Sequence, residues 1–182
     1  MSHAVLVGGG ARSGKSDLAL RLALSQPGRR VFLATATPSD EEMSDRIARH
    51  QADRGDLFET LEEPLDVPDV VASHPCDVLL VDCLTLWLTN LLMAELGDAE
   101  IEARIDALVA ALDAPRALTV LVSNEVGLGI VPMNALARRF RDLTGRAHQR
   151  LAVRADEVWF GAMGMMLRLK PGPVEAVPRA GL

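Results

Sequence analysis

A glycine-rich segment near the N-terminus carries the most specific chemical signal in this sequence. It consists of eight consecutive residues, Gly9-Gly10-Ala11-Arg12-Ser13-Gly14-Lys15-Ser16. They match the pattern G-x-x-x-x-G-K-[ST], and the context agrees, because an apolar stretch precedes them and a helical pattern follows. Backbone N–H groups and the helix N-terminus would face an anion, Lys15 would reach the β- and γ-phosphates, and Ser16 would offer its hydroxyl to Mg²⁺. We therefore predict that this loop binds a nucleoside triphosphate with Mg²⁺.

A carboxylate at the end of another strand would complete such a Mg²⁺ site. Asp82 directly follows the apolar run Val78–Val81, which predicts a buried strand. An unpaired aspartate at that position would be costly to bury, which favours a metal or catalytic role. The alternative is an N-cap for a helix that begins near Leu84, and the two roles are compatible.

One of the four histidines lies in a distinctive context. Arg46, His50 and Arg54 are spaced i, i+4, i+8 on a predicted polar helix, so they share one stripe. Two neighbouring cations disfavour protonation of the imidazole, which leaves a neutral nucleophile beside two phosphate-binding side chains. A solvated charged helix face explains the same spacing. The remaining histidines, which we interpret as structural or surface residues, are His3, His74 and His148.

The elements that position these residues alternate between strands and helices. The predicted strands are continuous apolar runs, which is typical of a parallel sheet covered on both faces. They are Ala4–Val7, Val31–Ala34, Val78–Val81, Leu118–Val122, Val158–Phe160 and Met166–Leu169. The predicted helices are Ser16–Leu24, Asp40–Arg54, Leu84–Leu96, Ala99–Leu112 and Pro132–Arg154. We therefore predict one α/β domain over residues 1–182, with a loose tail over 171–182, and ligands at the carboxyl ends of the strands.

Composition excludes several classes of protein. The formal net charge of −6 argues against a nucleic-acid-binding surface, which is usually basic. The apolar stretch Val78–Ala94 is interrupted by polar residues and is better interpreted as a strand followed by a helix, so we expect no membrane span. We find no secretory signal, and Cys76 and Cys83 match no zinc pattern, so we expect buried thiols in the cytoplasm.

The phosphate loop alone does not name a reaction, because kinases, ATPases and GTPases share it. The sequence has no Asn-Lys-x-Asp guanine-reading element, which disfavours a regulatory GTPase. One alternative is a monofunctional small-molecule kinase, which would need the loop and Asp82 but not His50. Another is a nucleotide-dependent ATPase or switch that regulates a protein partner and has no small-molecule acceptor.

Four motifs occur together in a specific order along the chain. They are the phosphate loop, Ala34-Thr35-Ala36, Arg46-Ile47-x-x-His50 and Asn124-Glu125-Val126-Gly127-x-Gly129-Ile130-Val131-Pro132. In this combination the sequence resembles the bifunctional adenosylcobinamide kinase / adenosylcobinamide-phosphate guanylyltransferase family of cobalamin biosynthesis. The resemblance extends from the first predicted strand to about Lys170.

This resemblance implies a fold and a two-step reaction. The fold is a P-loop NTPase-type three-layer sandwich, mostly parallel with an antiparallel strand near the C-terminus, and members are homotrimers. ATP or GTP first phosphorylates the terminal hydroxyl of adenosylcobinamide, a corrinoid. GTP then guanylylates a histidine, and the GMP passes to adenosylcobinamide phosphate. The carrier histidine falls on His50, so the resemblance favours the nucleophile over the solvated face.

The resemblance also implies which residues contact the nucleotide. Besides the phosphate loop, they are Ala34, Thr35, Ala36, Gln51, Ala52, Asp53, Arg54, Glu62 and Asp82. Glu59 and Glu63 lie close to Glu62 in the sequence, so the assignment among these three stays open. Some members have glutamate at the position of Asp82, and aspartate shortens the reach. Three further residues are interpreted either as site-lining or as structural caps, namely Asn90, Asn124 and Glu125.

Overall fold

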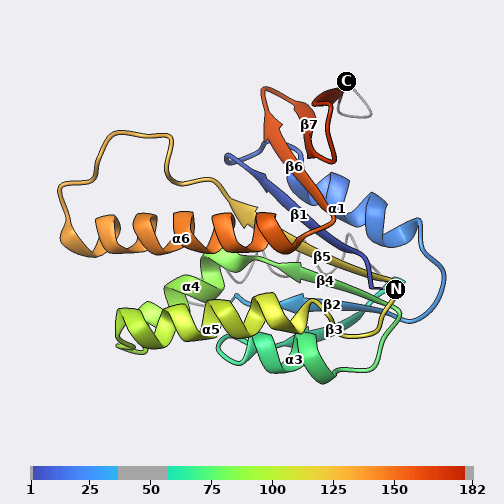
Figure 1. The fold of residues 1–182 in the computed structure, drawn as a ribbon, viewed down its shortest axis with the longest axis horizontal. Coiled ribbons are helices and arrows are strands. Elements are labelled where there is room, and N and C mark those ends of the chain that lie inside the picture. The colour runs from blue at the N-terminus through green and yellow to red at the C-terminus, as the bar shows by residue number, and fades with distance from the viewer. Residues whose placement is uncertain (1, 37–56, 179–182) are drawn as a thin grey trace.

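A computed structural model describes residues 2–36 and 57–178 of the chain, and these form a single mixed sheet with flanking helices (Figure 1). The strands are β1 (Ala4–Gly9), β2 (Arg30–Ala34), β3 (Glu59–Glu62), β4 (Val78–Asp82), β5 (Leu118–Asn124), β6 (Glu157–Ala162), β7 (Met165–Lys170) and β8 (Glu175–Pro178). The helices are α1 (Lys15–Leu24), α3 (Val67–Ser73), α4 (Leu84–Met93), α5 (Asp98–Ala111) and α6 (Ala135–Arg154). The predicted helix Asp40–Arg54 lies outside the described residues.

The strand order is β3-β2-β4-β5-β1-β6-β7-β8, and the pairings from β3 through β6 are all parallel. β7 is antiparallel to both of its neighbours, so the prediction of a mostly parallel sheet with an antiparallel strand near the C-terminus is confirmed. The expected loose tail is wrong in part. Glu175–Pro178 pair with β7 as β8, because the exposed edge of the β6–β7 hairpin offers free ladder groups to the chain that follows.

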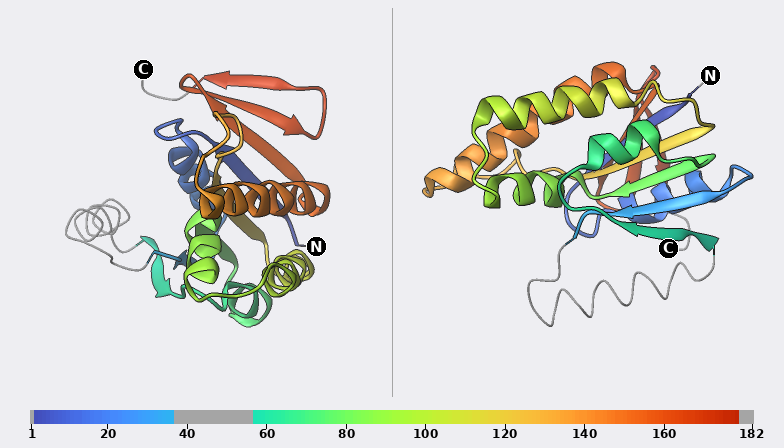
Figure 2. Two further views of the ribbon diagram at one scale, coloured as in Figure 1. Left: turned by 90° about the vertical axis from the view of Figure 1, so that its left-hand side faces the viewer. Right: turned by 90° about the horizontal axis from the view of Figure 1, so that it is seen from below.

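Helices lie on both faces of the sheet (Figure 2). Each face also carries a layer of buried apolar side chains. Alternate residues of the central strands point to opposite sides, so Leu6 belongs to one layer and Val7 to the other. The layer around Leu6 contains buried side chains of α3, α4, α5 and α6, including Trp87. Among the described helices, α1 contributes buried side chains to the opposite layer, on the other face of the sheet. The three-layer arrangement therefore follows from strands that are apolar on both faces.

Two described elements between residues 57 and 77 were not predicted. β3 is a short edge strand of sequence Glu-Thr-Leu-Glu whose side chains are largely exposed, so it lacks the apolar pattern of a buried strand. α3 has seven residues with Pro68 in its first turn, which is too short for a helical period to stand out. The apolar stretch Val78–Ala94 divides into β4 and α4 as expected. In the described part of the chain no helix is both long and apolar enough to cross a membrane.

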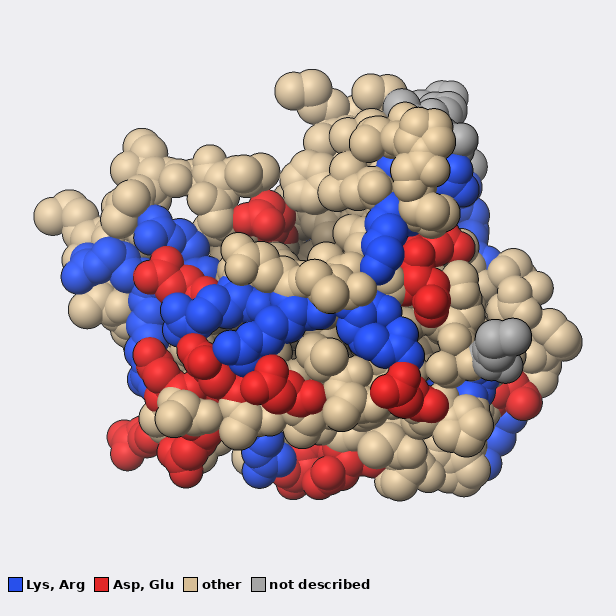
Figure 3. Space-filling view, viewed as in Figure 1, with Lys and Arg blue, Asp and Glu red and all other residues tan. Residues whose placement is uncertain are grey.

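Ion pairs join α6 to α5 along the outer surface. Arg150 contacts both Glu102 and Asp106, and Arg146 contacts Glu102. Figure 3 shows the resulting row of basic side chains lying above a row of acidic ones. Each surface pair contributes little by itself. These pairs run along the contact between α5 and α6, and the first half of α6 projects beyond the sheet on the side where the parallel strands end (Figure 1).

A buried threonine ties the end of β2 to the end of β4. The Thr35 hydroxyl donates to the Cys83 carbonyl at 2.8 Å and accepts from the Cys83 N–H at 2.9 Å, and Thr35 has no exposed surface. Asn90 Nδ2 donates to the Thr35 carbonyl at 2.8 Å and to the Pro64 carbonyl at 3.1 Å. Asn90 is therefore a structural residue that joins the loops after β2 and β3.

Replacing Thr35 with valine keeps the shape of the side chain and removes the hydroxyl. We expect Thr35→Val to lower the free energy of unfolding by about 1–3 kcal/mol, because the buried N–H of Cys83 loses its acceptor. Urea unfolding measures the change. The matched control is Thr89→Val, whose hydroxyl donates to the Thr85 carbonyl within α4 and should cost less than about 0.5 kcal/mol. Equal losses in the two variants would contradict the role of the Thr35 hydroxyl in joining the end of β2 to the end of β4.

Candidate nucleotide site

The predicted phosphate loop connects β1 to α1. Gly14 precedes α1 with a φ of +92°, a left-handed conformation that favours glycine and turns the chain into the helix. Lys15 is 9% exposed, and its Nζ donates to the Gly10 carbonyl at 3.0 Å, so the ammonium lies across the loop. The loop N–H groups, the helix N-terminus and this ammonium together provide a site for a polyanion.

The phosphate loop also packs tightly against the neighbouring strand β6. Gly9 has a φ of +151°, and a Cβ on it would lie 2.7 Å from the Gly161 carbonyl oxygen. A Cβ on Gly161 would lie 2.7 Å from Ser13 Oγ and 2.9 Å from Met166 Sδ. Among the described residues, the buried Ser13 Oγ has no hydrogen-bond partner, and a phosphate oxygen would supply one. Gly161 was not predicted as a site residue, because only the sheet order places it beside the loop.

The carboxyl ends of β2, β3 and β4 place three predicted contact residues side by side. Ala34 pairs with Glu62 on one side and with Asp82 on the other. The Thr35 hydroxyl is occupied by Cys83, and Ala36 is half-buried in the segment that follows β2. β5 separates the strand of Asp82 from the strand that leads into the phosphate loop. All these residues therefore lie on the side of the sheet where the parallel strands end.

The three neighbouring glutamates have different surroundings. Glu59 lies at the opposite end of β3, where Arg29 Nη2 contacts its carboxylate at 2.7 Å. Glu63 accepts hydrogen bonds from the N–H groups of Leu65 and Asp66 and so caps a turn. Glu62 is exposed at the edge, next to Ala34. This placement favours Glu62 over the other two as a nucleotide contact.

Ser16 and Asp82 suit a magnesium ion that a nucleotide brings with it. Ser16 lies in the first turn of α1 and Asp82 at the end of β4. No cluster of three or more His, Cys, Asp or Glu side chains that could hold a metal by themselves occurs within residues 2–36 and 57–178. Mg²⁺ typically takes one or two protein oxygens and completes its octahedron with phosphates and water, so this sparse set fits.

A polar cluster lies beneath the edge, between β4 and β5. Asn124, which pairs with Gly9 at the end of β5, donates from Nδ2 to Thr85 Oγ1 at 2.9 Å. Thr85 Oγ1 also contacts Cys83 Sγ at 3.1 Å. Burial, followed by the nearby Asp82 carboxylate, raises the pKa of the Cys83 thiol, so the thiol stays protonated and serves as a structural group.

A histidine that we interpreted as structural or surface lies beside this cluster. His148, on α6, contacts the Ser123 hydroxyl with Nε2 at 2.7 Å and the Glu125 carboxylate with Nδ1 at 3.6 Å. Burial lowers the pKa of His148, and the facing Glu125 carboxylate partly offsets that effect. No local pattern distinguishes His148 in the sequence, because its partners come from a strand 25 residues away.

Several predicted residues lie outside the described part of the chain. They are Arg46, His50, Gln51, Ala52, Asp53 and Arg54. The structure brings together the phosphate loop, the segment Ala34–Ala36, Glu62 and Asp82. This arrangement can bind a nucleoside triphosphate and stabilise negative charge that develops on its phosphates.

Comparison with known proteins identifies the family. The family model for cobinamide kinase / cobinamide phosphate guanyltransferase matches residues 5–169. The chain belongs to that family. Bifunctional adenosylcobalamin biosynthesis protein CobP of Pseudomonas aeruginosa is 44% identical over 93% of this chain and 98% of its own length. Bifunctional adenosylcobalamin biosynthesis protein CobU of Salmonella typhimurium is 41% identical over 91% of this chain and 99% of its own length.

Solved structures of more distant proteins share the fold. The flagellar accessory protein FlaH of Methanocaldococcus jannaschii has a TM-score of 0.54 at 12% identity, over 98% of this chain and 80% of its own. A prototypical ATPase from the type III secretion system of pathogenic bacteria has a TM-score of 0.52 at 12% identity, over 88% of this chain and 51% of its own. The P-loop NTPase-type fold that the family resemblance implied is thus confirmed.

The contact between the loop and β6 generates a prediction for Gly161→Ala. The new methyl group must displace both Ser13 and the flexible end of Met166, so we expect affinity for ATP and GTP to fall by about tenfold or more, in line with the 1–3 kcal/mol typical of overpacking. Isothermal titration calorimetry measures the affinity. Adding Ser13→Gly should restore part of the loss because it removes the obstructing atoms.

Gly145→Ala is the matched control for that substitution. Gly145 lies within α6, and a Cβ there would meet no atom within 4 Å. We expect unchanged nucleotide affinity and a gain in stability of about 0.5–1 kcal/mol from the better helix propensity. Unchanged affinity in Gly161→Ala as well would show that β6 does not position the loop.

Proposed function

We propose that this protein phosphorylates adenosylcobinamide with ATP or GTP and then transfers GMP from GTP to adenosylcobinamide phosphate, through a guanylyl-histidine on His50. The observation that carries the proposal is the match over nearly the full length of relatives named as bifunctional adenosylcobalamin biosynthesis proteins. The phosphate loop and the carboxylates along the same sheet edge supply the chemistry that both reactions need. The homotrimer implied by the resemblance remains a prediction.

In the kinase step, the acceptor hydroxyl attacks the γ-phosphorus and the bond to the β–γ bridging oxygen breaks. Lys15 and the loop N–H groups face the phosphates on which negative charge develops. Ser16 and Asp82 would hold Mg²⁺, which neutralises charge on the β- and γ-oxygens when bound. Rigid placement of these groups matters most here, because phosphoryl transfer depends chiefly on positioning and electrostatics.

In the second reaction, His50 attacks the α-phosphorus of GTP and pyrophosphate leaves. A phosphate oxygen of adenosylcobinamide phosphate then attacks the same phosphorus, the bond to His50 breaks, and adenosyl-GDP-cobinamide forms. The covalent intermediate divides one difficult transfer into two displacements. Arg46 and Arg54, one helical turn away on either side in the predicted helix, would hold the phosphates that His50 attacks.

The proposed nucleotide contacts extend the site beyond the phosphates. They are Ala34, Thr35, Ala36, Gln51, Ala52, Asp53, Arg54, Glu62 and Asp82. Because the Thr35 hydroxyl is already engaged, its contribution would come through the course of the main chain after β2. Glu62 is open to solvent at the sheet edge, which suits a direct contact.

The test is incubation with GTP labelled at the α-phosphate, followed by denaturation and measurement of bound label. We expect an acid-labile adduct in the wild type, none in His50→Ala, and at least about a hundredfold less in Lys15→Ala, because loss of charge stabilisation slows the transfer. His3→Ala is the matched control, since His3 contacts Glu157 at the far end of the sheet. An adduct at the wild-type level in His50→Ala would overturn the assigned mechanism.

The same assay separates the alternatives. Phosphoryl transfer to adenosylcobinamide without any adduct would indicate a monofunctional kinase. Nucleotide hydrolysis without transfer to a corrinoid, together with nucleotide-dependent binding of a protein, would indicate a regulatory ATPase.

A further inference from the structure

Three polar residues form a connected set beside the phosphate loop, and the proposed chemistry assigns them no role. Ser123 Oγ lies 2.7 Å from His148 Nε2, and His148 Nδ1 lies 3.6 Å from Glu125 Oε2. The other carboxylate oxygen of Glu125 accepts a hydrogen bond from the Gly127 N–H. With Ser123 donating to Nε2, the Nδ1 proton of neutral His148 faces the Glu125 carboxylate.

The order serine, imidazole, carboxylate is that of a hydrolase triad, but the burial differs. Ser123 has no exposed surface and lies within β5, paired with Gly8 of the central sheet. A substrate carbonyl could not reach its hydroxyl. The side chains of His148 and Glu125 are both partly open to solvent, at 20% and 23% exposure. Because the serine is closed off and Glu125 lies next to the phosphate loop, the group that can meet a ligand is the carboxylate, and the serine and histidine orient it.

The position of Glu125 is fixed relative to the phosphate loop. Its N–H donates to the carbonyl of Gly9, the first residue of the loop, at 2.9 Å. The preceding residue, Asn124, pairs with Gly9 across the β5–β1 ladder. Glu125 also begins the segment that runs to α6 and projects beyond the sheet edge (Figure 1). Figure 3 shows a notch between that segment and the β6–β7 hairpin, open to an acceptor from solvent.

We propose that Glu125 takes the proton of the acceptor hydroxyl in the kinase step, and that His148 is the positioning residue that orients its carboxylate. As the hydroxyl oxygen bonds to the γ-phosphorus and the bond to the β–γ bridging oxygen breaks, the proton moves to Glu125 and leaves to solvent after the nucleoside diphosphate departs. This inference rests on the proposed kinase activity. It adds a base to a site in which the loop and Mg²⁺ handle only the phosphates.

The experiment measures phosphoryl transfer from γ-labelled ATP to adenosylcobinamide. We expect Glu125→Gln to lower kcat by about a hundredfold or more, which is typical of a lost general base, with the KM for ATP changed less than about threefold. Formation of the GMP adduct should stay near the wild-type rate, since that step removes no proton from the acceptor hydroxyl. A wild-type kcat in Glu125→Gln would overturn the proposal.

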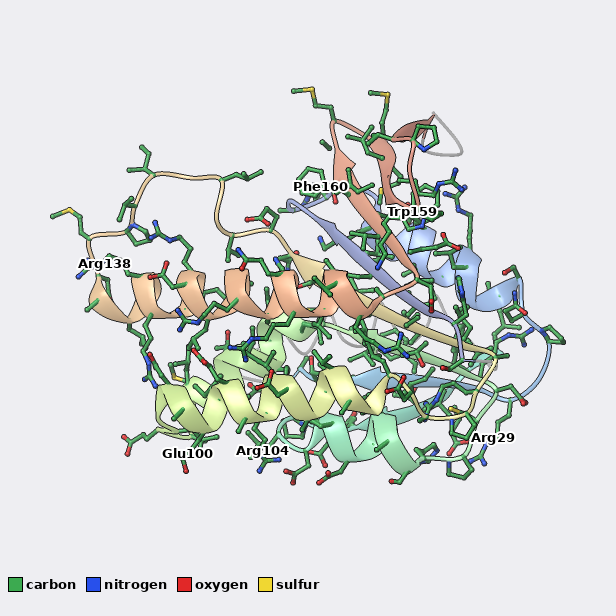
Figure 4. All side chains as sticks on the ribbon, in the orientation of Figure 1. Arg29, Glu100, Arg104, Arg138, Trp159 and Phe160 are labelled. Carbon is green, nitrogen blue, oxygen red and sulfur yellow. The ribbon has the colours of Figure 1, made fainter. Side chains whose placement is uncertain are left out.

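A rescue measurement distinguishes a proton acceptor from a residue that only caps a turn. In Glu125→Ala, added formate should raise the phosphoryl-transfer rate in proportion to its concentration, because it supplies the missing carboxylate. Formate should leave the wild type unaffected. The matched control is Glu100→Gln, since Glu100 also accepts a backbone N–H, that of Gly97, but lies on α5, away from the segment after β5 (Figure 4). Failure of formate to rescue a folded Glu125→Ala would assign Glu125 to the turn alone.

Two substitutions at His148 test its positioning role. Asparagine places an N–H near the position of Nδ1 and keeps a donor for Glu125, whereas glutamine places one near Nε2 and keeps only the contact with Ser123. We expect His148→Asn to retain a kcat at least about fivefold above that of His148→Gln, with comparable melting temperatures. Equal kcat values, or a higher value for glutamine, would contradict orientation of Glu125 by His148.

A wild-type protein that transfers no phosphoryl group to adenosylcobinamide would instead refute the proposed function on which this inference rests. The two failures are therefore distinguishable.

Discussion

A phosphate loop binds its ligand through backbone N–H groups, so its curve must be held rigidly before the ligand arrives. In this protein the constraint is met by close approach of main chains. Gly9 has a positive φ, which favours glycine. Gly161, its partner on β6, has no side chain that would displace Ser13. The loop is thereby confined between β6, α1 and the end of β5.

The strands next to the loop place further groups of the site at the carboxyl ends of the parallel strands. Parallel strands end together, so residues far apart in the chain, among them Ala34, Asp82 and Asn124, reach the same side of the sheet. Burying polar groups there is costly unless each finds a partner. Thr35, Asn90 and Thr85 provide those partners between strands. The scaffold under the site is thus polar and internally satisfied, while the layers above and below it are apolar.

Sequence patterns predicted the parts of this structure that depend on local residues. The glycine-rich loop, the six apolar strands, α1 to within one residue and the start of α4 follow from spacing and hydrophobicity, as does Asp82 at a strand end. α4 ends at Met93, three residues before the predicted end. β3 was not predicted because it forms through pairing with β2 and has no apolar pattern of its own. β8 was assigned to a loose tail because it likewise forms through pairing, with β7. Gly161, Ser123 and His148 gain their positions only through strand order and helix packing, which no local pattern encodes.

The central claim is that a single nucleotide site passes GMP through a covalent intermediate to a phosphorylated corrinoid. The most direct measurement isolates protein carrying α-labelled GMP, removes free GTP, adds adenosylcobinamide phosphate and follows the label over time. The account predicts that label leaves the protein and appears in adenosyl-GDP-cobinamide at least as fast as steady-state turnover. Label that stays on the protein, or that is released only as free GMP while turnover continues, would contradict it.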